Sequence, residues 1–152
     1  MCLLKNKDNM KLFLLYLFFI GIAFADDSAW ISTRSDEVNV RTGPSEEYPI
    51  KYTYQVKDMP LLAFGQYDNW YKVRDKDNEE GWINKNLAIS KRNLIVINGT
   101  QTIYKSEKLT AKILFKAEEN VVLEYAKCSA AWCKVKVNGK TGWIQKEGIW
   151  GY

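Results

Sequence analysis

The chain has 152 residues, with 22 Lys and Arg, 18 Asp and Glu, and no His. Its formal net charge of +4 is too small to indicate a nucleic-acid-binding protein. Without histidine, the chain cannot build a Cys–His or Ser–His nucleophilic site. The composition therefore points away from these classes of hydrolase and towards a binding protein.

Residues 1–25 have the pattern of a secretory signal peptide. Basic residues up to Lys11 precede an apolar run over 12–24, which ends at the small-residue site Ala23-Phe24-Ala25. Met10 is an alternative start, since Met10-Lys11 supplies a minimal basic segment. The apolar run is shorter than the about 20 residues that a spanning helix needs. We therefore expect cleavage after Ala25, with an uncleaved anchor as the alternative, and a periplasmic or secreted protein that is not inserted in the membrane.

One phrase occurs twice in the remaining chain. Trp70-Tyr71-Lys72-Val73 is followed, after a polar turn, by Gly81-Trp82-Ile83. Trp132-Cys133-Lys134-Val135 is followed, after a shorter turn, by Gly142-Trp143-Ile144. An internal repeat of this kind predicts two copies of one small structural unit.

Both copies consist of short runs with strand character, separated by turn signals, and neither shows a helical stripe. We therefore predict an all-β protein of two tandem small barrels, with module one at 28–90 and module two at 91–152. In this comparison Ile113-Leu114-Phe115 corresponds to Tyr52-Thr53-Tyr54. No Gly/Ser or Pro linker lies near Ser90, so the modules are expected to pack as one body.

The two modules differ in charge. Residues 28–90 hold eight Lys and Arg against ten Asp and Glu, whereas 91–152 hold eleven against five. The resulting net charges of −2 and +6 indicate either attraction between the modules or an anionic partner for the second one. Neutral variation of a solvated surface remains the alternative.

Cys128 and Cys133 are the two cysteines that follow the predicted cleavage site. An even pair in an exported protein predicts a disulfide, and a hairpin would place the two residues opposite each other. Such a short closed loop predicts a gain in stability of about 2 kcal/mol. Zinc would need four ligands, which the chain does not supply, so no metal site is predicted.

The order of several motifs carries a family resemblance. Module one contains Asn39-Val40-Arg41-Thr42-Gly43-Pro44-Ser45, then Tyr48-Pro49, and then the repeated phrase. This order resembles the bacterial SH3 (SH3b) family, and in particular its exported two-module proteins, which the tail Ile149-Trp150-Gly151-Tyr152 also resembles. The resemblance implies SH3-like barrels. It also implies a binding role, because some members target peptidoglycan peptides. Module two departs from the pattern, since Tyr104-Lys105-Ser106-Glu107 replaces the Arg-x-Gly-Pro loop, and is predicted to be degenerate and mostly structural.

Aromatic residues supply the candidate binding groove. Strand alternation places Val73 on the core side and Trp70 beside Lys72 on the outer side, with Trp132 in the same position of module two. Outward tryptophans can serve as recognition platforms. In the alternative, Trp70 and Trp132 pack between the modules or cap the barrel ends. The predicted ligand-binding residues in module one are Arg41, Tyr48, Tyr54, Trp70 and Trp82. Arg41 is expected to brace its own loop, or alternatively to bind a carboxylate.

The adjacent carboxylates Glu46-Glu47 and Glu79-Glu80 lie in turn-like stretches and are interpreted as solvated loop charge, not as a glycosidase pair. We therefore predict a non-enzymatic protein without cofactor or metal. Its expected partner is a peptidoglycan peptide or another envelope ligand. A periplasmic protein–protein adaptor is the alternative, and no nucleic-acid partner is expected.

Overall fold

Strands and tight turns build residues 28–152, which are the part of the chain that the computed structural model describes. The predicted signal peptide lies outside these described residues. Module one contains β1 (Ala29–Thr33), β2 (Val38–Arg41), β3 (Ile50–Tyr54), β4 (Pro60–Tyr67), β5 (Trp70–Arg74), β6 (Glu80–Asn84), the 3₁₀ turn η1 (Lys85–Leu87) and β7 (Ala88–Ile89). Module two contains β8 (Asn93–Val96), β9 (Gln101–Tyr104), β10 (Ile113–Ala117), β11 (Val122–Cys128), β12 (Trp132–Val137), β13 (Lys140–Gln145), the 3₁₀ turn η2 (Lys146–Gly148) and β14 (Ile149–Trp150). Within 28–152 no helix has the length and apolar character needed to cross a membrane.

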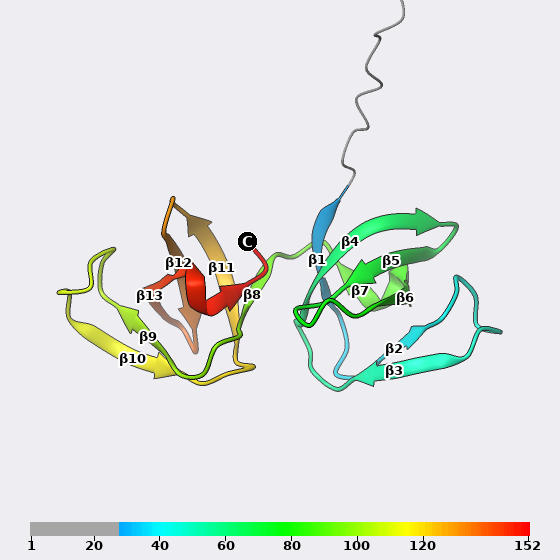
Figure 1. The fold of residues 1–152 in the computed structure, drawn as a ribbon, viewed down its shortest axis with the longest axis horizontal. Coiled ribbons are helices and arrows are strands. Elements are labelled where there is room, and N and C mark those ends of the chain that lie inside the picture. Colours follow the sequence, from blue (N-terminus) through cyan, green and yellow to red (C-terminus); the bar gives the residue numbers. More distant parts are fainter. Residues whose placement is uncertain (1–27) are drawn as a thin grey trace, which may run out of the picture.

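The strands form two separate seven-stranded antiparallel sheets that lie side by side in Figure 1. Their strand orders are β3-β2-β6-β5-β4-β1-β7 and β10-β9-β13-β12-β11-β8-β14. The second order is the first with each strand replaced by its counterpart in module two, so the two sheets have the same topology. Each sheet curls into a small barrel, so the all-β prediction with two tandem barrels is confirmed.

The register of the strands repeats between the modules. Lys72 lies opposite Trp82, which in turn pairs with Arg41. In module two Lys134 lies opposite Trp143, which pairs with Tyr104. The two halves of the repeated phrase are therefore the two central strands of each barrel.

One predicted correspondence is wrong. Tyr52 pairs with Val40, and its counterpart in module two is Phe115, which pairs with Ile103. Tyr54 therefore corresponds to Ala117, two residues beyond the predicted partner. The connection after β10 is one residue shorter than the connection after β3. A single offset in residue number therefore cannot align β3 with β10 and also align the two copies of the repeated phrase.

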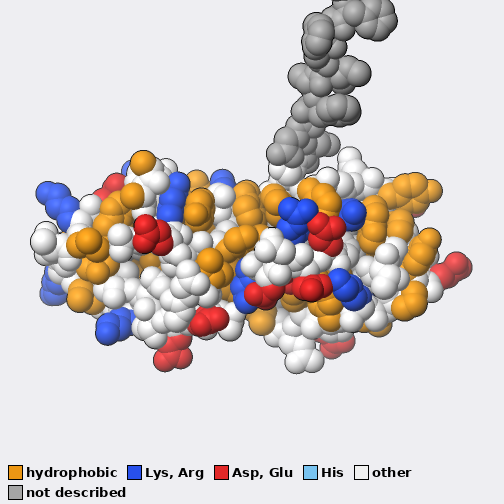
Figure 2. Space-filling model, viewed as in Figure 1, with side chains coloured by type: hydrophobic (Ala, Val, Ile, Leu, Met, Phe, Trp, Pro, Cys, Tyr) orange, Lys and Arg blue, Asp and Glu red, His pale blue; other side chains and the backbone are white. Residues whose placement is uncertain are grey.

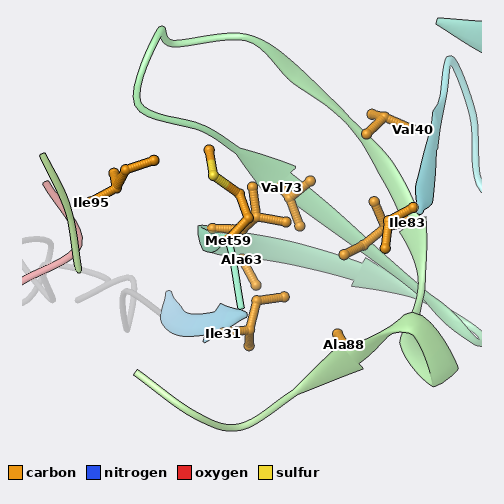
Figure 3. Close-up of a cluster of buried hydrophobic side chains, with 10 residues drawn as sticks. Ile31, Val40, Met59, Ala63, Val73, Ile83, Ala88 and Ile95 are labelled. Atoms are coloured by element: carbon orange, nitrogen blue, oxygen red, sulfur yellow. The ribbon is translucent and has the colours of Figure 1, made fainter. Parts of the chain in front are cut away.

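Alternate residues of the repeated phrase form the cores. Val73 and Ile83 in module one, and Val135 and Ile144 in module two, are fully buried, as alternation predicts. Figure 3 shows the module-one cluster, in which Ile95 enters from strand β8 of module two and points toward Met59. The core of module one is thus completed by its neighbour.

Polar groups close the seam between the modules. Asn93 is 0 % exposed, and its Nδ2 donates to Ser32 Oγ at 3.1 Å and to the Asp58 carbonyl oxygen at 3.1 Å. Ser32 Oγ donates to the Lys91 carbonyl oxygen at 2.7 Å. Because these bonds join residues of different modules, they fix one barrel against the other.

Aromatic residues cover the same seam, but they are not those considered from the sequence. Trp30 of β1 meets Trp150 of β14 edge to face, with ring centroids 4.6 Å apart. The Arg92 guanidinium lies 5.8 Å from the Trp30 ring and 4.7 Å from that of Tyr125. Trp70 lies among residues of module one and Trp132 packs on Tyr104 of module two, so the alternative that they pack between the modules is wrong.

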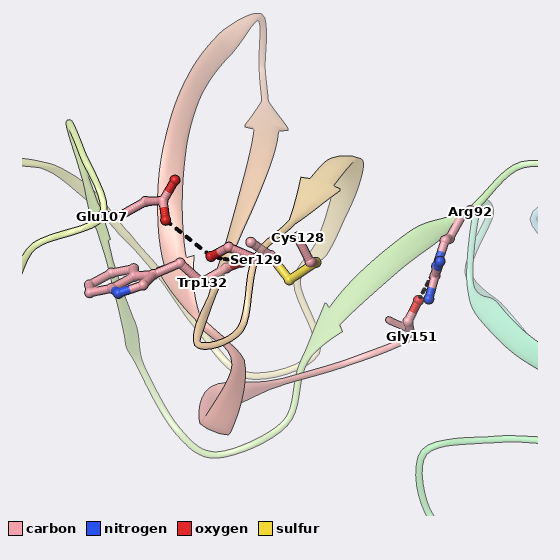
Figure 4. The surroundings of a disulfide bond; sticks show 7 residues. Arg92, Glu107, Cys128, Ser129, Trp132 and Gly151 are labelled. Carbon is pink, nitrogen blue, oxygen red and sulfur yellow. Dashed lines mark hydrogen bonds between the residues drawn. A yellow bond between two sulfur atoms is a disulfide. The ribbon is translucent and has the colours of Figure 1, made fainter.

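Cys128 and Cys133 form a disulfide across the β11–β12 hairpin, and their Cα atoms are 4.0 Å apart. Ser129, beside Cys128, donates from Oγ to the Glu107 carboxylate at 3.0 Å (Figure 4). The bridged hairpin is thereby tied to the β9–β10 loop.

Candidate functional site

The most defined candidate site is a pocket of about 320 Å³ at one end of module one. Strand β2, the loop that follows it, β5, β6 and the 3₁₀ turn η1 all contribute. Its lining residues are Asn39, Arg41, Glu46, Trp70, Asn84, Asn86 and Leu87. The volume lies at the lower end of the range for small-ligand sites. We call this site pocket one.

Local backbone geometry positions the polar groups of pocket one. Asn84 caps η1, because its Oδ1 accepts from the Asn86 backbone N–H at 2.9 Å. Asn39 Oδ1 accepts from Thr53 Oγ1 at 2.8 Å. In both asparagines the side-chain oxygen is engaged, which orients the amide nitrogen as a donor for a ligand.

Pocket one carries both signs of charge. Arg41 Nη1 donates to the Tyr48 carbonyl oxygen at 2.8 Å, so Arg41 braces its own loop as expected, while a guanidinium has further N–H donors. Glu46 forms no ion pair with any described residue. A ligand that offers a carboxylate and an ammonium group would match this pair.

The prediction that Trp70 points outward is wrong. Its side chain is only 7 % exposed. Alternation does put it on the face opposite Val73, but β2, β6 and η1 close around that end of the barrel. Trp70 therefore caps the barrel, in line with the second alternative, and forms the apolar floor of the pocket together with Leu87.

The other three predicted groove residues lie elsewhere. Tyr48 is 47 % exposed, and its ring lies over Gly43, where an added Cβ would come within 2.5 Å of Cδ1. Trp82 lines a separate recess of about 340 Å³ with Lys72 and Glu80. Of the five predicted residues, the structure thus brings only Arg41 and Trp70 into pocket one, while Tyr48, Tyr54 and Trp82 do not line it.

Tyr54 lies on β3, the edge strand of the module-one sheet, and packs against the core of that module. Its hydroxyl donates to Asp75 Oδ2 at 2.7 Å, and its ring meets that of Tyr52 at a centroid distance of 5.3 Å. Asp75 Oδ1 also accepts the backbone N–H groups of Asp77 and Glu79. Tyr54 therefore supports the β5–β6 loop and does not face pocket one.

Replacing Tyr54 with Phe tests this supporting role. Burial, with the hydrogen bonds to Tyr52 and Asp75, raises the pKa of the Tyr54 phenol well above its usual range. We expect Tyr54→Phe to lower the free energy of unfolding by about 1 kcal/mol. Because the folded-state pKa is raised, this contribution is complete below the unfolded pKa of about 10 and is lost as the pH rises above it. Urea titrations at pH 7 and above pH 10 measure the difference, and an equal difference at both would contradict the assignment.

Module two has a different arrangement at the position of pocket one. Tyr104 replaces Arg41, and its ring packs edge to face on Trp132 with centroids 5.6 Å apart. Figure 4 shows Glu107 beside Trp132, held by its hydrogen bond to Ser129. An aromatic ring thus stands where module one offers a guanidinium.

Five residues of pocket one were missed by sequence reasoning. They are Asn39, Glu46, Asn84, Asn86 and Leu87. The usable signal was the segment directly after Gly81-Trp82-Ile83, because an Asn there can cap a short turn and present further polar groups.

Comparison with known proteins identifies the family. A model of the bacterial SH3 domain matches residues 34–88 and again residues 98–151. The chain therefore belongs to the bacterial SH3 domain family and contains two copies of the domain, as the resemblance implied.

Several known proteins are similar to part of this chain. A probable cell wall amidase, LytH, of Staphylococcus aureus is 33% identical over 87 residues, which cover 53% of this chain and 29% of the amidase. The chain thus spans less than a third of the length of the curated relatives it matches. Among solved structures, NlpC2 of Trichomonas vaginalis is 14% identical, with a TM-score of 0.37, over 84% of this chain and 49% of that one. An NlpC/P60 family protein of Bacillus cereus is 13% identical, with a TM-score of 0.35, over 82% and 56% of the two chains.

Proposed function

We propose that this chain is an exported, non-enzymatic binding protein whose pocket one recognises a peptide of the cell wall or another envelope ligand. The observation that carries the proposal is that Arg41 and Glu46, which forms no ion pair with a described residue, both line pocket one together with the apolar Trp70. A short peptide with free carboxylate and ammonium groups fits this combination of charges. Membership in the bacterial SH3 family and the similarity to a probable cell wall amidase support a cell-wall ligand and a periplasmic or secreted location.

Two further observations support a role in binding rather than catalysis. The chain contains no His, so a neutral-pH base of that kind is missing. Among residues 28–152, no group of three or more Cys, Asp and Glu side chains is placed to hold a metal ion.

Sedimentation with purified peptidoglycan tests the proposal, using Glu46→Gln and Asn86→Ala as variants. Both side chains are exposed and line pocket one, so the changes should not affect folding. Each is expected to weaken binding about fivefold, which corresponds to a loss of about 1 kcal/mol. Glu47→Gln is the matched control, because Glu47 is also exposed but does not line the pocket. Equal retention of all four proteins, or no retention above an unrelated control protein, would refute the proposal.

The adaptor alternative has its own support in module two. Leu109, Ile113 and Leu114 are exposed apolar side chains on and beside β10. In Figure 2 the end of the molecule formed by module two carries several Lys and Arg side chains around apolar ones. Apolar groups rimmed by charge are typical of protein interfaces. Crosslinking to a defined envelope protein, without retention on peptidoglycan, would favour this function.

A further inference from the structure

The two modules differ most in the space behind their outer strands, β3 and β10. These strands form one edge of each sheet and the outer side of each barrel (Figure 1). The registers make Tyr54 of β3 equivalent to Ala117 of β10, and Asp75 after β5 equivalent to Val137 of β12. The duplicated framework thus allows a direct comparison of one position in two copies.

In module one this space is filled. The Tyr54 ring occupies it, the Tyr52 ring packs against Tyr54, and the Asp75 carboxylate accepts the Tyr54 hydroxyl. Asp75 is itself buried and receives two backbone N–H groups. The space therefore accommodates an aromatic ring, and the polar end of that ring is satisfied by the protein.

In module two the same space is open. The equivalent residue is the small Ala117, which lines an open cavity of about 430 Å³, the largest of those described. Its apolar lining comes from Phe115, Ala117, Val121 and Val137. Phe115 occupies the position that Tyr52 has in module one, so one wall of the cavity is also aromatic.

The rim of the space is also more positively charged in module two. At the position of Thr53, module two has Lys116. At the position of Glu79, which lies opposite Asp75, it has Lys140, which pairs with Val137. Neither ammonium group forms an ion pair with a described residue, whereas Glu79 is paired with Lys51 at 2.6 Å. The charged residues that line the cavity are Lys116, Lys140 and Glu118. Because two are basic and one is acidic, the rim of the cavity carries a net positive charge.

We propose that module two binds a small aromatic anion in this cavity, with an apolar ring in the space that Tyr54 fills in module one and a carboxylate at Lys116 and Lys140. The ring would contact Phe115 and Val137, where burial of apolar surface favours binding. The carboxylate would meet two ammonium groups that form no ion pair with any residue of 28–152. The ligand is either a free aromatic acid or an aromatic residue with a nearby carboxylate at the end of a peptide. The cavity is separate from pocket one and shares no lining residue with it.

Titration followed by amide NMR shifts of residues 28–152 tests the proposal. N-acetylphenylalanine supplies the ring and the carboxylate, and N-acetylphenylalaninamide is the same probe without the charge. We expect saturable shifts around Ala117 and Val137 with the acid, and at least about fivefold weaker binding of the amide, from the loss of about 1 kcal/mol of charge-assisted hydrogen bonding. A short peptide that ends in Phe with a free carboxylate distinguishes the two sources: tighter binding than the free acid indicates a peptide ligand, and equal or weaker binding a free acid.

Three variants separate this site from folding and from pocket one. Ala117→Tyr with Val137→Asp rebuilds the Tyr54–Asp75 pair and should abolish the shifts while the remaining spectrum stays dispersed. Lys140→Glu changes only an exposed side chain and should weaken the acid more than about fivefold while leaving the amide unchanged. Glu46→Gln in pocket one should leave the binding of the acid as it is. The proposal is overturned if the acid gives no saturable shifts, or if Lys140→Glu binds the acid as tightly as the unchanged protein.

Discussion

Gly81→Ala is expected to lower the free energy of unfolding by about 3 kcal/mol. A Cβ atom built at Gly81 would lie 2.2 Å from Val40 Cγ1 and 3.1 Å from the Arg41 carbonyl oxygen. Both neighbours belong to β2, which pairs with β6 next to this point, and Val40 is fully buried. Close-packed neighbours cannot move aside without opening the barrel, so the added methyl group forces strands apart. A urea titration with Trp fluorescence measures the change.

Gly65→Ala is the matched control. The glycine also lies in a strand of module one, but a Cβ atom added there would meet only Lys72 Cβ, at the ordinary contact distance of 3.4 Å. Its substitution should change the free energy of unfolding by less than about 1 kcal/mol, with a gain expected from the loss of unfolded-chain entropy. Similar effects of the two substitutions would show that β2 does not require glycine at position 81.

The same restriction explains why the repeated phrase contains glycine twice. At Gly142 an added Cβ would lie 2.3 Å from Ile103 Cγ2 and 3.1 Å from the Tyr104 carbonyl oxygen. Ile103 and Tyr104 are the module-two equivalents of Val40 and Arg41. The glycine of the phrase is therefore explained by the close approach of two paired strands in each barrel, and not by a ligand.

The framework could be predicted from sequence because its signals are local and occur twice. Alternation placed Val73, Val135, Ile83 and Ile144 in the cores, and the duplicated phrase gave the number of modules. The Asn138-Gly139 turn has positive φ at both residues, as a two-residue hairpin needs. Each of these features depends on neighbours close in sequence.

Pocket one could not be predicted to the same extent, since its walls come from separated segments. Alternation gives the face on which Trp70 lies, but not that η1 covers this face with Leu87. Similarly, Tyr54 could be recognised as an aromatic residue near the Gly43 loop, but its partner Asp75 lies 21 positions further along the chain. Aromatic composition alone does not distinguish a residue that supports a loop from one that meets a ligand.

The contrast between Tyr54 and Ala117 was hidden by loop lengths. Module two is one residue shorter in the connection after β10 and shorter again in the β12–β13 turn. A sequence comparison with one offset therefore pairs Tyr54 with Phe115, which suggests that the space is filled in both copies. The strand register instead assigns Ala117 to this position. Its side chain is too small to fill the space, so the cavity stays open.

Trp150→Ala is expected to destabilise module one, although Trp150 belongs to the last strand of module two. The side chain packs against the module-one core and meets Trp30 of β1 edge to face. Removing a large, partly buried aromatic ring is expected to cost about 3 kcal/mol, including about 1 kcal/mol from the ring pair. Hydrogen exchange at the amides of β1 and β4 measures the effect in module one directly, because exchange reports the stability of individual elements.

Tyr67→Ala serves as the control for Trp150→Ala. Tyr67 is 65 % exposed at the end of β4, so its loss should change stability by no more than about 0.5 kcal/mol. If the seam holds the barrels together, Trp150→Ala accelerates exchange in module one, and an unchanged pattern there would mean that the barrels are energetically independent.

Coupling of this kind has a consequence for binding. Pocket one and the cavity of module two would then keep a fixed separation, so that a ligand carrying both chemical groups binds more tightly than the sum of its parts only when its length matches that separation.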